Sequence, residues 1–185
     1  SAYWDRNLQI VVVANGPHQP WIRKIITDFS LQDRVAAVDF DERLSRLAYA
    51  ASDFMLMPSL FEPCGLPQMT APIYGSLPVV HSTGGLYDTV RVLDVEKSTG
   101  NGFRFECYGS EGLRWAIDQA MAFHALPTEV RAREISRIME ESVLEFSHKE
   151  VARRYIDIYE RMLERPLVET ESGEAIKAMA AGIQD

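Results

Sequence analysis

The alternation of short apolar runs with helical segments is the feature that most constrains the fold of this 185-residue chain. Apolar residues between the runs recur at helical spacing, as at Trp21, Ile25 and Phe29. A crossover between parallel strands needs a dozen or more residues, which these segments provide. The alternation predicts an α/β domain with a doubly wound parallel sheet and helices on both faces. The expected strands lie at 8–14, 34–40, 54–57, 77–80 and 102–105.

The last third of the chain has the pattern of helices. Residues 128–146 keep helical spacing, and Ser147 followed by Glu150 has the spacing of a capping box. The helix after it is expected to run to about residue 163, with an apolar stripe. The stripe consists of Val151, Tyr155, Ile158, Tyr159 and Met162. We expect a domain over 1–165 and a polar tail over 166–185 that is poorly ordered or needs a partner surface.

Charge and composition restrict the partners. The chain has 19 Lys and Arg against 27 Asp and Glu, a net charge of -8, so nucleic acid is not expected as a partner. Its apolar runs are far shorter than the ~20 residues of a membrane span, so no membrane is expected either. Cys64 and Cys107 have neither CxxC spacing nor the density of a secreted disulfide scaffold, which favours a reducing compartment. No signal-peptide pattern is visible at the start of the sequence. The start without Met favours a piece of a longer chain.

Ligands of an open parallel sheet bind beyond the carboxyl ends of its strands, where loops 15–16, 40–41, 58–65 and 82–85 are expected. In the loop after the third run, Pro63 fixes the turn and Gly65 lets the backbone approach a ligand. A helix expected from about residue 66 to 74 would point its free N–H groups at a phosphate or a hydroxyl group. Glu62 either accepts hydrogen bonds from sugar hydroxyls or complements the helix dipole.

The loop after the fourth run repeats this arrangement. Thr83, Gly84 and Gly85 expose consecutive amides that can form an anion-binding concavity. A lone Thr-Gly-Gly is more often a plain turn, but the neighbouring loop favours a shared phosphate site. The histidines show no metal-ligand spacing, so no metal site is expected. His81 is either a structural residue or a ligand contact, and Cys64 lacks the histidine partner of a nucleophile.

Three motifs occur together: EPCGLPQ at 62–68, YGSLPVV at 74–80 and STGGLYDTV at 82–90. They resemble the C-terminal half of bacterial glycogen synthases and plant starch synthases, and the likeness runs from about residue 8 to 163. The resemblance implies a Rossmann-like domain, one half of a two-domain GT-B glycosyltransferase, followed by C-terminal helices. It also implies a retaining hexosyltransferase that moves glucose from ADP-glucose to the non-reducing end of an α-1,4-glucan. The missing N-terminal domain would bind the glucan, so the isolated chain is expected to be inactive.

The resemblance also assigns roles at the donor-sugar end of the site. Glu62 would be the catalytic residue that hydrogen-bonds the donor glucose, and Cys64 would line the same pocket. The amides of Gly65 and Leu66, with those of residues 83–85, would hold glucose hydroxyls and the distal phosphate. Such amides stabilise the charge that develops on the departing nucleotide, so no metal and no cofactor besides ADP-glucose is expected.

The nucleotide end of the site departs from the family pattern. Gly16 and Phe40 would bind the nucleotide, but Phe40 stands where relatives usually have a Tyr, and the turn at 14–17 has fewer glycines. Thr70 stands where other retaining glycosyltransferases often have a second Glu. The Arg and Lys that clamp the pyrophosphate in the family lie upstream of residue 8. Two alternatives remain: a non-catalytic nucleotide-sugar-binding or regulatory module, and a related synthase that uses UDP-glucose. The location would be cytoplasmic in a bacterium and plastidic in a plant.

Overall fold

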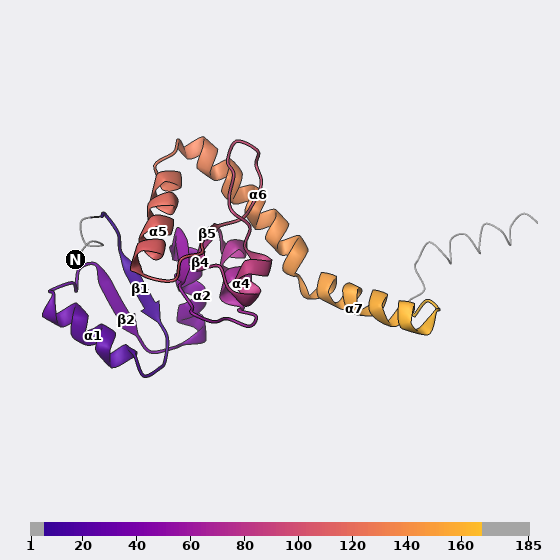
Figure 1. The fold of residues 1–185 in the computed structure, drawn as a ribbon, viewed down its shortest axis with the longest axis horizontal. Helices are drawn as coiled ribbons and strands as arrows, with labels where there is room; N and C mark the ends of the chain where they lie inside the picture. The colour runs from indigo at the N-terminus through magenta and orange to yellow at the C-terminus, as the bar shows by residue number, and fades with distance from the viewer. Residues whose placement is uncertain (1–5, 168–185) are drawn as a thin grey trace, which may run out of the picture. The chain divides into compact units, whose positions relative to one another are not determined.

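The computed structural model describes residues 6–167, and the elements alternate along the chain as the sequence predicts (Figure 1). All five expected strands form, close to their predicted positions. The strands are β1 (Ile10–Val13), β2 (Val35–Val38), β3 (Phe54–Met57), β4 (Leu77–His81) and β5 (Phe103–Phe105). The helices are α1 (Gln19–Asp28), α2 (Glu42–Ala51), α3 (Pro67–Thr70), the 3₁₀ helix η1 (Ala71–Tyr74), α4 (Gly84–Thr89), α5 (Ser110–His124), α6 (Thr128–Phe146) and α7 (His148–Leu163).

The strand pairing is parallel throughout, as predicted, but it is divided between two sheets. One sheet has the order β1-β2 and the other has the order β3-β4-β5. The registers run from Ile10↔Val35 in the first sheet and from Phe54↔Leu77 in the second. Within the described residues, no ladder joins β1 to β3. The sequence patterns predict strands but not their long-range pairing, so the division could not be foreseen.

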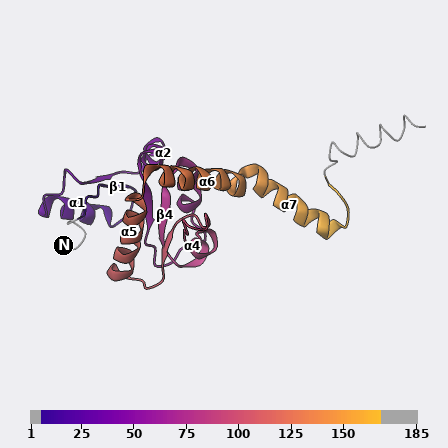
Figure 2. The same cartoon turned by 90° about the horizontal axis from the view of Figure 1, so that it is seen from above.

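Strand β4 lies at the centre of the domain because helices cover both of its faces. Leu77 and Val79 face a core formed with residues of α5 and α6, including Phe123 and Ile138. Val80, on the opposite face, packs on residues of α4 and the turn after it. Figure 2 shows β4 between α5 and α4. The near-continuous apolarity of this strand is therefore explained by burial on both sides.

Local chemistry sets where the helices begin and end. Asp41 caps α2, since its side chain accepts a hydrogen bond from the Leu44 amide at 2.7 Å. The helix expected over 66–74 is broken into α3 and η1, because Pro72 lacks the N–H that an α-helix would use there. Gly75 then ends η1 in the left-handed conformation at φ 88°.

The contacts among its residues group the chain into two compact units, the first ending at Ser142 and the second beginning at Val143. In the second unit, Ser147 accepts a hydrogen bond from the Glu150 amide and caps α7, as the sequence predicts. The carboxylate of Glu150 does not turn back to Ser147 but binds Arg153 and Arg154 instead. The apolar stripe of α7 is exposed. No helix among the described residues is long and apolar enough to span a membrane.

The predicted boundary between 165 and 166 stays a prediction. Most of the expected tail, residues 168–185, lies outside the described residues, and so do residues 1–5.

Candidate functional site

The loops that follow β3 and β4 are joined backbone to backbone. The Gly85 amide donates a hydrogen bond to the Glu62 carbonyl oxygen at 3.0 Å. A Cβ atom at Gly84 would overlap the carbonyl of Glu62, and one at Gly85 would overlap the carbonyl of Cys64. Gly84 also has a φ of 44°, which disfavours other residues. Both glycines are therefore required for the close approach of these two loops.

The buried side chain of Gln68 supports the same junction through hydrogen bonds to its backbone. Its side chain is 1% exposed, and Nε2 donates to the carbonyl oxygens of Cys64 at 2.9 Å and Gly65 at 3.0 Å. Thr89 completes the link, because its hydroxyl donates to the Gly85 carbonyl. Gln68 is thus a positioning residue that the sequence analysis missed. The only signal was its place in the EPCGLPQ motif.

His81 fixes the start of the loop after β3. Its Nδ1 lies 2.8 Å from the Ser59 carbonyl oxygen, and since a carbonyl can only accept, Nδ1 carries the proton. The imidazole is buried and packs on the rings of Phe105 and Tyr108, with centroids 5.4 and 5.0 Å away. This geometry favours the structural alternative for His81.

Glu62 is half-buried at the lip of this junction. The four-residue α3 begins only at Pro67, so Glu62 is not in the first turn of a helix and the dipole alternative does not apply. Within residues 6–167, no hydrogen bond or ion pair engages its carboxylate. The carboxylate is therefore available to accept hydrogen bonds from a ligand.

The predicted amide donors differ in their availability. The Thr83 amide donates to the His81 carbonyl at 2.9 Å, and the Gly85 amide is taken by Glu62. Gly84 is the first residue of α4, a position whose N–H has no acceptor within the helix. Cys64 and Leu66 are exposed beside the junction and Gly65 is half-buried. The anion-binding concavity expected from three consecutive amides therefore has at most one of them free.

The nucleotide end of the predicted site lies on the loops after β1 and β2. The Phe40 amide donates to Asn15 Oδ1 at 3.0 Å, which joins these loops to each other. Phe40 is 56% exposed and Gly16 is exposed. In the described part of the chain, no hydrogen bond links this pair of loops to the junction at Glu62 and Gly85. The structure thus brings the predicted residues together in two groups.

An ion cluster supports the loop that leads into β5. Glu134 of α6 is 0% exposed and accepts hydrogen bonds from Ser98 at 2.9 Å and from Arg133 and Arg137 at 3.0 Å each. Arg137 also donates to the Gly100 carbonyl at 2.8 Å. Burial alone would raise the pKa of Glu134, but the hydrogen bonds outweigh it and the pKa lies below the ordinary 4.5.

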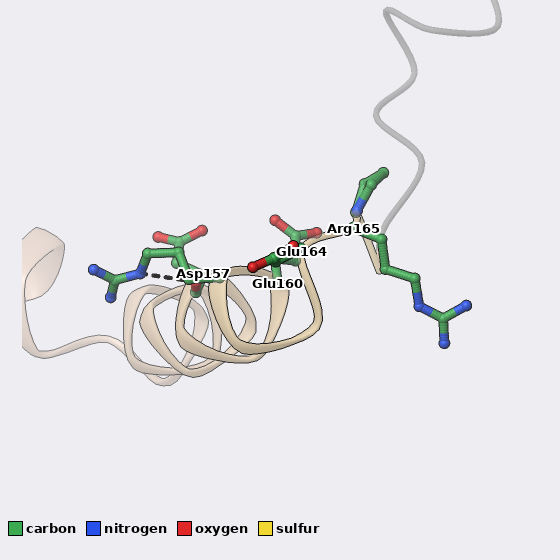
Figure 3. Close-up of a pocket in the computed structure, with 6 residues that line it drawn as sticks. Asp157, Glu160, Glu164 and Arg165 are labelled. Atoms are coloured by element: carbon green, nitrogen blue, oxygen red, sulfur yellow. Dashed lines mark hydrogen bonds between the residues drawn. The ribbon is translucent and has the colours of Figure 1, made fainter.

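A hollow elsewhere on the chain does not form part of the site. It lies at the end of α7 and is lined by Asp157, Glu160, Arg161, Glu164, Arg165 and Pro166. Figure 3 shows that these residues come from one helix and the turn after it. No second element contributes to the hollow, so it cannot enclose a ligand. Among residues 6–167, no group of three or more His, Cys, Asp or Glu side chains is placed to hold a metal ion.

Comparison with known proteins relates the chain to glucan synthases, although no family model matches it. It is 41% identical over 121 residues to glycogen synthase from Bacillus subtilis (strain 168), which covers 65% of this chain and 25% of that protein. It is 38% identical over 154 residues to glycogen synthase from Clostridioides difficile (strain 630), covering 83% and 31%.

The solved structures agree with these relatives. The catalytic domain of starch synthase IV from Arabidopsis thaliana, bound to ADP and acarbose, has a TM-score of 0.72 and 35% identity over 85% of this chain and 33% of that one. Sucrose-phosphate synthase from Thermosynechococcus elongatus, at 23% identity and a TM-score of 0.61, shares the fold. The chain spans a quarter to a third of the curated relatives described above. It belongs to the glycogen synthase and starch synthase family and has the fold of a GT-B glycosyltransferase domain.

Proposed function

We propose that this chain is the donor-binding, C-terminal domain of a retaining glucosyltransferase that uses ADP-glucose to extend an α-1,4-glucan at its non-reducing end. One observation carries the proposal: the junction between Gly85 and Glu62 leaves the Glu62 carboxylate unengaged at the carboxyl ends of β3 and β4. That edge of a parallel sheet is where ligands bind. The starch synthase IV structure, which contains ADP, supports the choice of nucleotide. The full protein would act in the cytoplasm of a bacterium or in a plant plastid.

The residues of this chain would act on the donor by binding and orientation. Glu62 accepts hydrogen bonds from glucose hydroxyls, and Cys64 lines the pocket beside it. The amides of Gly65, Leu66 and Gly84 face the distal phosphate and stabilise the negative charge that grows on it as the glucosyl bond breaks. Because these donors are fixed before the reaction, they need no reorganisation at the moment of transfer. No step in this scheme requires a metal ion.

Phe40 and Gly16 would bind the nucleotide. The exposed Phe40 ring offers a flat apolar face to adenine, and the loop at Gly16 lets the backbone approach the ribose or phosphates. The α-1,4-glucan would be held by a domain outside these 185 residues. The chain alone is therefore expected to bind ADP weakly and to transfer no glucose.

Calorimetry with ADP tests the proposal. We expect a Kd of about 1 mM, or roughly -4 kcal/mol, because the phosphate-clamping side chains of the family are absent from this chain. UDP is expected to bind more weakly than ADP, and Phe40→Ala should abolish the difference by removing the ring that stacks on the base. Leu144→Ala, an exposed change on α6, is the matched control.

Each outcome of this titration is informative. ADP binding that Phe40→Ala leaves unchanged would contradict the assigned nucleotide site. No ADP binding at 10-fold above the expected Kd, roughly 10 mM, would contradict the proposal and favour the non-catalytic module. Tighter binding of UDP than of ADP would favour the UDP-glucose synthase.

A further inference from the structure

The turn at residues 64–66 directs two consecutive carbonyl groups at one buried atom. Gln68 Nε2 lies 2.9 Å from the Cys64 carbonyl oxygen and 3.0 Å from the Gly65 carbonyl oxygen. Successive carbonyls of an extended chain alternate in direction, so both can reach one atom only where the backbone bends. Gly65 allows this bend, because its φ of 75° lies in the left-handed region. The turn therefore has a face of carbonyls, and Gln68 lies against that face.

The same two peptide groups direct their N–H groups to the opposite side. In a planar trans peptide the N–H is antiparallel to the C=O, so the Gly65 and Leu66 amides point away from Gln68 Nε2. Gln68 is 1% exposed, whereas Cys64 and Leu66 are exposed, so this direction leads from the interior toward the surface. Within residues 6–167, no hydrogen bond engages either amide. Two unengaged donors thus point the same way, close in sequence to Glu62.

The side-chain amide of Gln68 holds these carbonyls at the expense of one of its own hydrogen bonds. Its Oε1 is buried and has no hydrogen-bond partner in the part of the chain that the structure describes. Turning the amide over would place Oε1 against two carbonyl oxygens, which can only accept. A buried acceptor without a partner lowers stability, and an apolar residue of similar length would avoid that loss. Stability alone therefore does not explain a glutamine at this position.

Contacts with the neighbouring loop fix Gln68 itself. Its Nε2 also lies 3.2 Å from the Thr89 hydroxyl oxygen, and that hydroxyl donates to the Gly85 carbonyl. The Thr89 carbonyl accepts a hydrogen bond at 3.0 Å from Asn101, which is 2% exposed. Buried side chains therefore set the direction of the two amides of the turn.

We propose that Gln68 aims the Gly65 and Leu66 amides at the distal phosphate of the donor and so acts on the rate of glucosyl transfer rather than on stability. The inference rests on the proposed function. Amides that are aimed before the reaction stabilise the charge that grows on the phosphate as the glucosyl bond breaks. Their direction affects the transition state more than the bound donor, so its loss lowers kcat more than it raises KM.

Gln68→Met in the full-length gene product tests this role, because methionine keeps the length of the side chain and removes both N–H donors. We expect kcat with ADP-glucose to fall about 100-fold, as when a fixed donor is lost from a site of developing charge. KM should change less than about 3-fold. The thermal unfolding midpoint should stay within about 3 °C of the wild type, because the exposed turn can rotate its carbonyls to water. Gln119→Met, the same substitution at an exposed position of α5, is the matched control and should change none of these quantities.

Gln68→Glu gives a second readout that does not depend on how methionine packs. An ionised carboxylate has no proton to donate, whereas the protonated form offers one O–H to the carbonyls. Burial favours the protonated form, so kcat of this variant relative to the wild type should rise as the pH falls from about 8 to about 6. A relative kcat that does not rise over this range would contradict the proposal.

A crystal structure of Gln68→Met separates this inference from the proposed function. The Cys64 or Gly65 carbonyl should be rotated toward solvent, and its peptide N–H turned inward. Unchanged peptides, a wild-type kcat, or a fall in kcat that comes with a large fall in the unfolding midpoint would overturn the role of Gln68. A wild-type full-length protein that transfers no glucose from ADP-glucose would contradict the proposed function instead, and the direction of the two peptides would then decide on Gln68.

Discussion

The two sheets of this domain differ in how fully they are buried. All five residues of β4 are buried, and both of its faces pack against helices. The first sheet has a small core of Ile26, Leu31 and Val35, and it leaves Val11 and Ala36 exposed. Burial contributes roughly 25 cal/mol per Å² of apolar surface, so the three-stranded sheet should provide most of the stability.

The two sheets also differ in how the loops of the proposed site are held together. The loops of the three-stranded sheet are joined by a backbone hydrogen bond, two glycines and the buried Gln68. The loops of the two-stranded sheet are joined by an exposed bond between Phe40 and Asn15, and Gln19 at the start of α1 donates to the Val38 carbonyl oxygen at 2.7 Å. The loops proposed to hold the sugar are therefore fixed by contacts within the chain.

The largest expected effect compares one leucine from each core. Leu77→Ala removes a fully buried side chain from the three-stranded sheet and should lower the free energy of unfolding by about 4 kcal/mol. Leu31→Ala, from the smaller core, should cost about 2 kcal/mol because water and neighbours can fill the space. Urea unfolding measures both. Equal losses would show that the two sheets contribute alike.

Removing the Glu134 side chain tests whether the ion cluster beside β5 adds to the stability of the three-stranded sheet. Glu134→Ala leaves Arg137, whose side chain is 19% exposed, without its buried partner, and should cost about 3 kcal/mol. Arg133→Ala is the matched control, since that partner is 60% exposed and its loss should cost less than about 1 kcal/mol. Thermal unfolding measures the stability of both variants. If Arg133→Ala destabilised the chain as much as Glu134→Ala, the burial of Glu134 would have no special role.

A methyl group at Gly85 tests the loop junction. Gly85→Ala should cost about 1–3 kcal/mol, because the new Cβ meets the Cys64 carbonyl and the loops must separate. ADP binding should weaken with it. Ser82→Ala in the same loop should change neither the free energy of unfolding nor the affinity for ADP.

For the first sheet, Asn15→Ala should lower the free energy of unfolding by only about 0.5 kcal/mol, since the hydrogen bond that it removes is exposed. Stability loss for Asn15→Ala as large as for Gly85→Ala would remove the contrast between the two loop pairs.

The smallest effect concerns an ion cluster on the surface of α7. Arg153 and Arg154 donate hydrogen bonds to Glu150 and hold its pKa at about 2, below the ordinary 4.5. Because the charged form is favoured in the helix, its contribution to α7 is present above pH 4.5 and is lost as the pH falls toward 2. Circular dichroism should show a slight loss of helix in that range for the chain but not for Glu150→Gln. Identical acid titrations of the two would contradict it.

The sequence predicted elements well where the pattern is local. The helix over 128–146 has the predicted bounds, and the Ser147 cap forms, because both depend on neighbouring residues. Pairing between distant segments was beyond such patterns, so neither the divided sheet nor the burial of Glu134 was foreseen. Gly84 and Gly85 were correctly placed after β4. Their need to admit the carbonyls of Glu62 and Cys64 became clear only when the two loops were seen together.

The two site loops are joined by a hydrogen bond between peptide groups, and this affects which residues of the site can change during evolution. A peptide carbonyl is the same whatever side chain its residue carries, so mutation at position 62 leaves the Gly85 bond in place. A side chain at position 84 or 85 would instead overlap the carbonyl of Glu62 or Cys64 and push the loops apart. Substitution at position 62 can therefore change the side chain presented at this edge of the sheet while Gly84 and Gly85 preserve the backbone geometry in which it is presented.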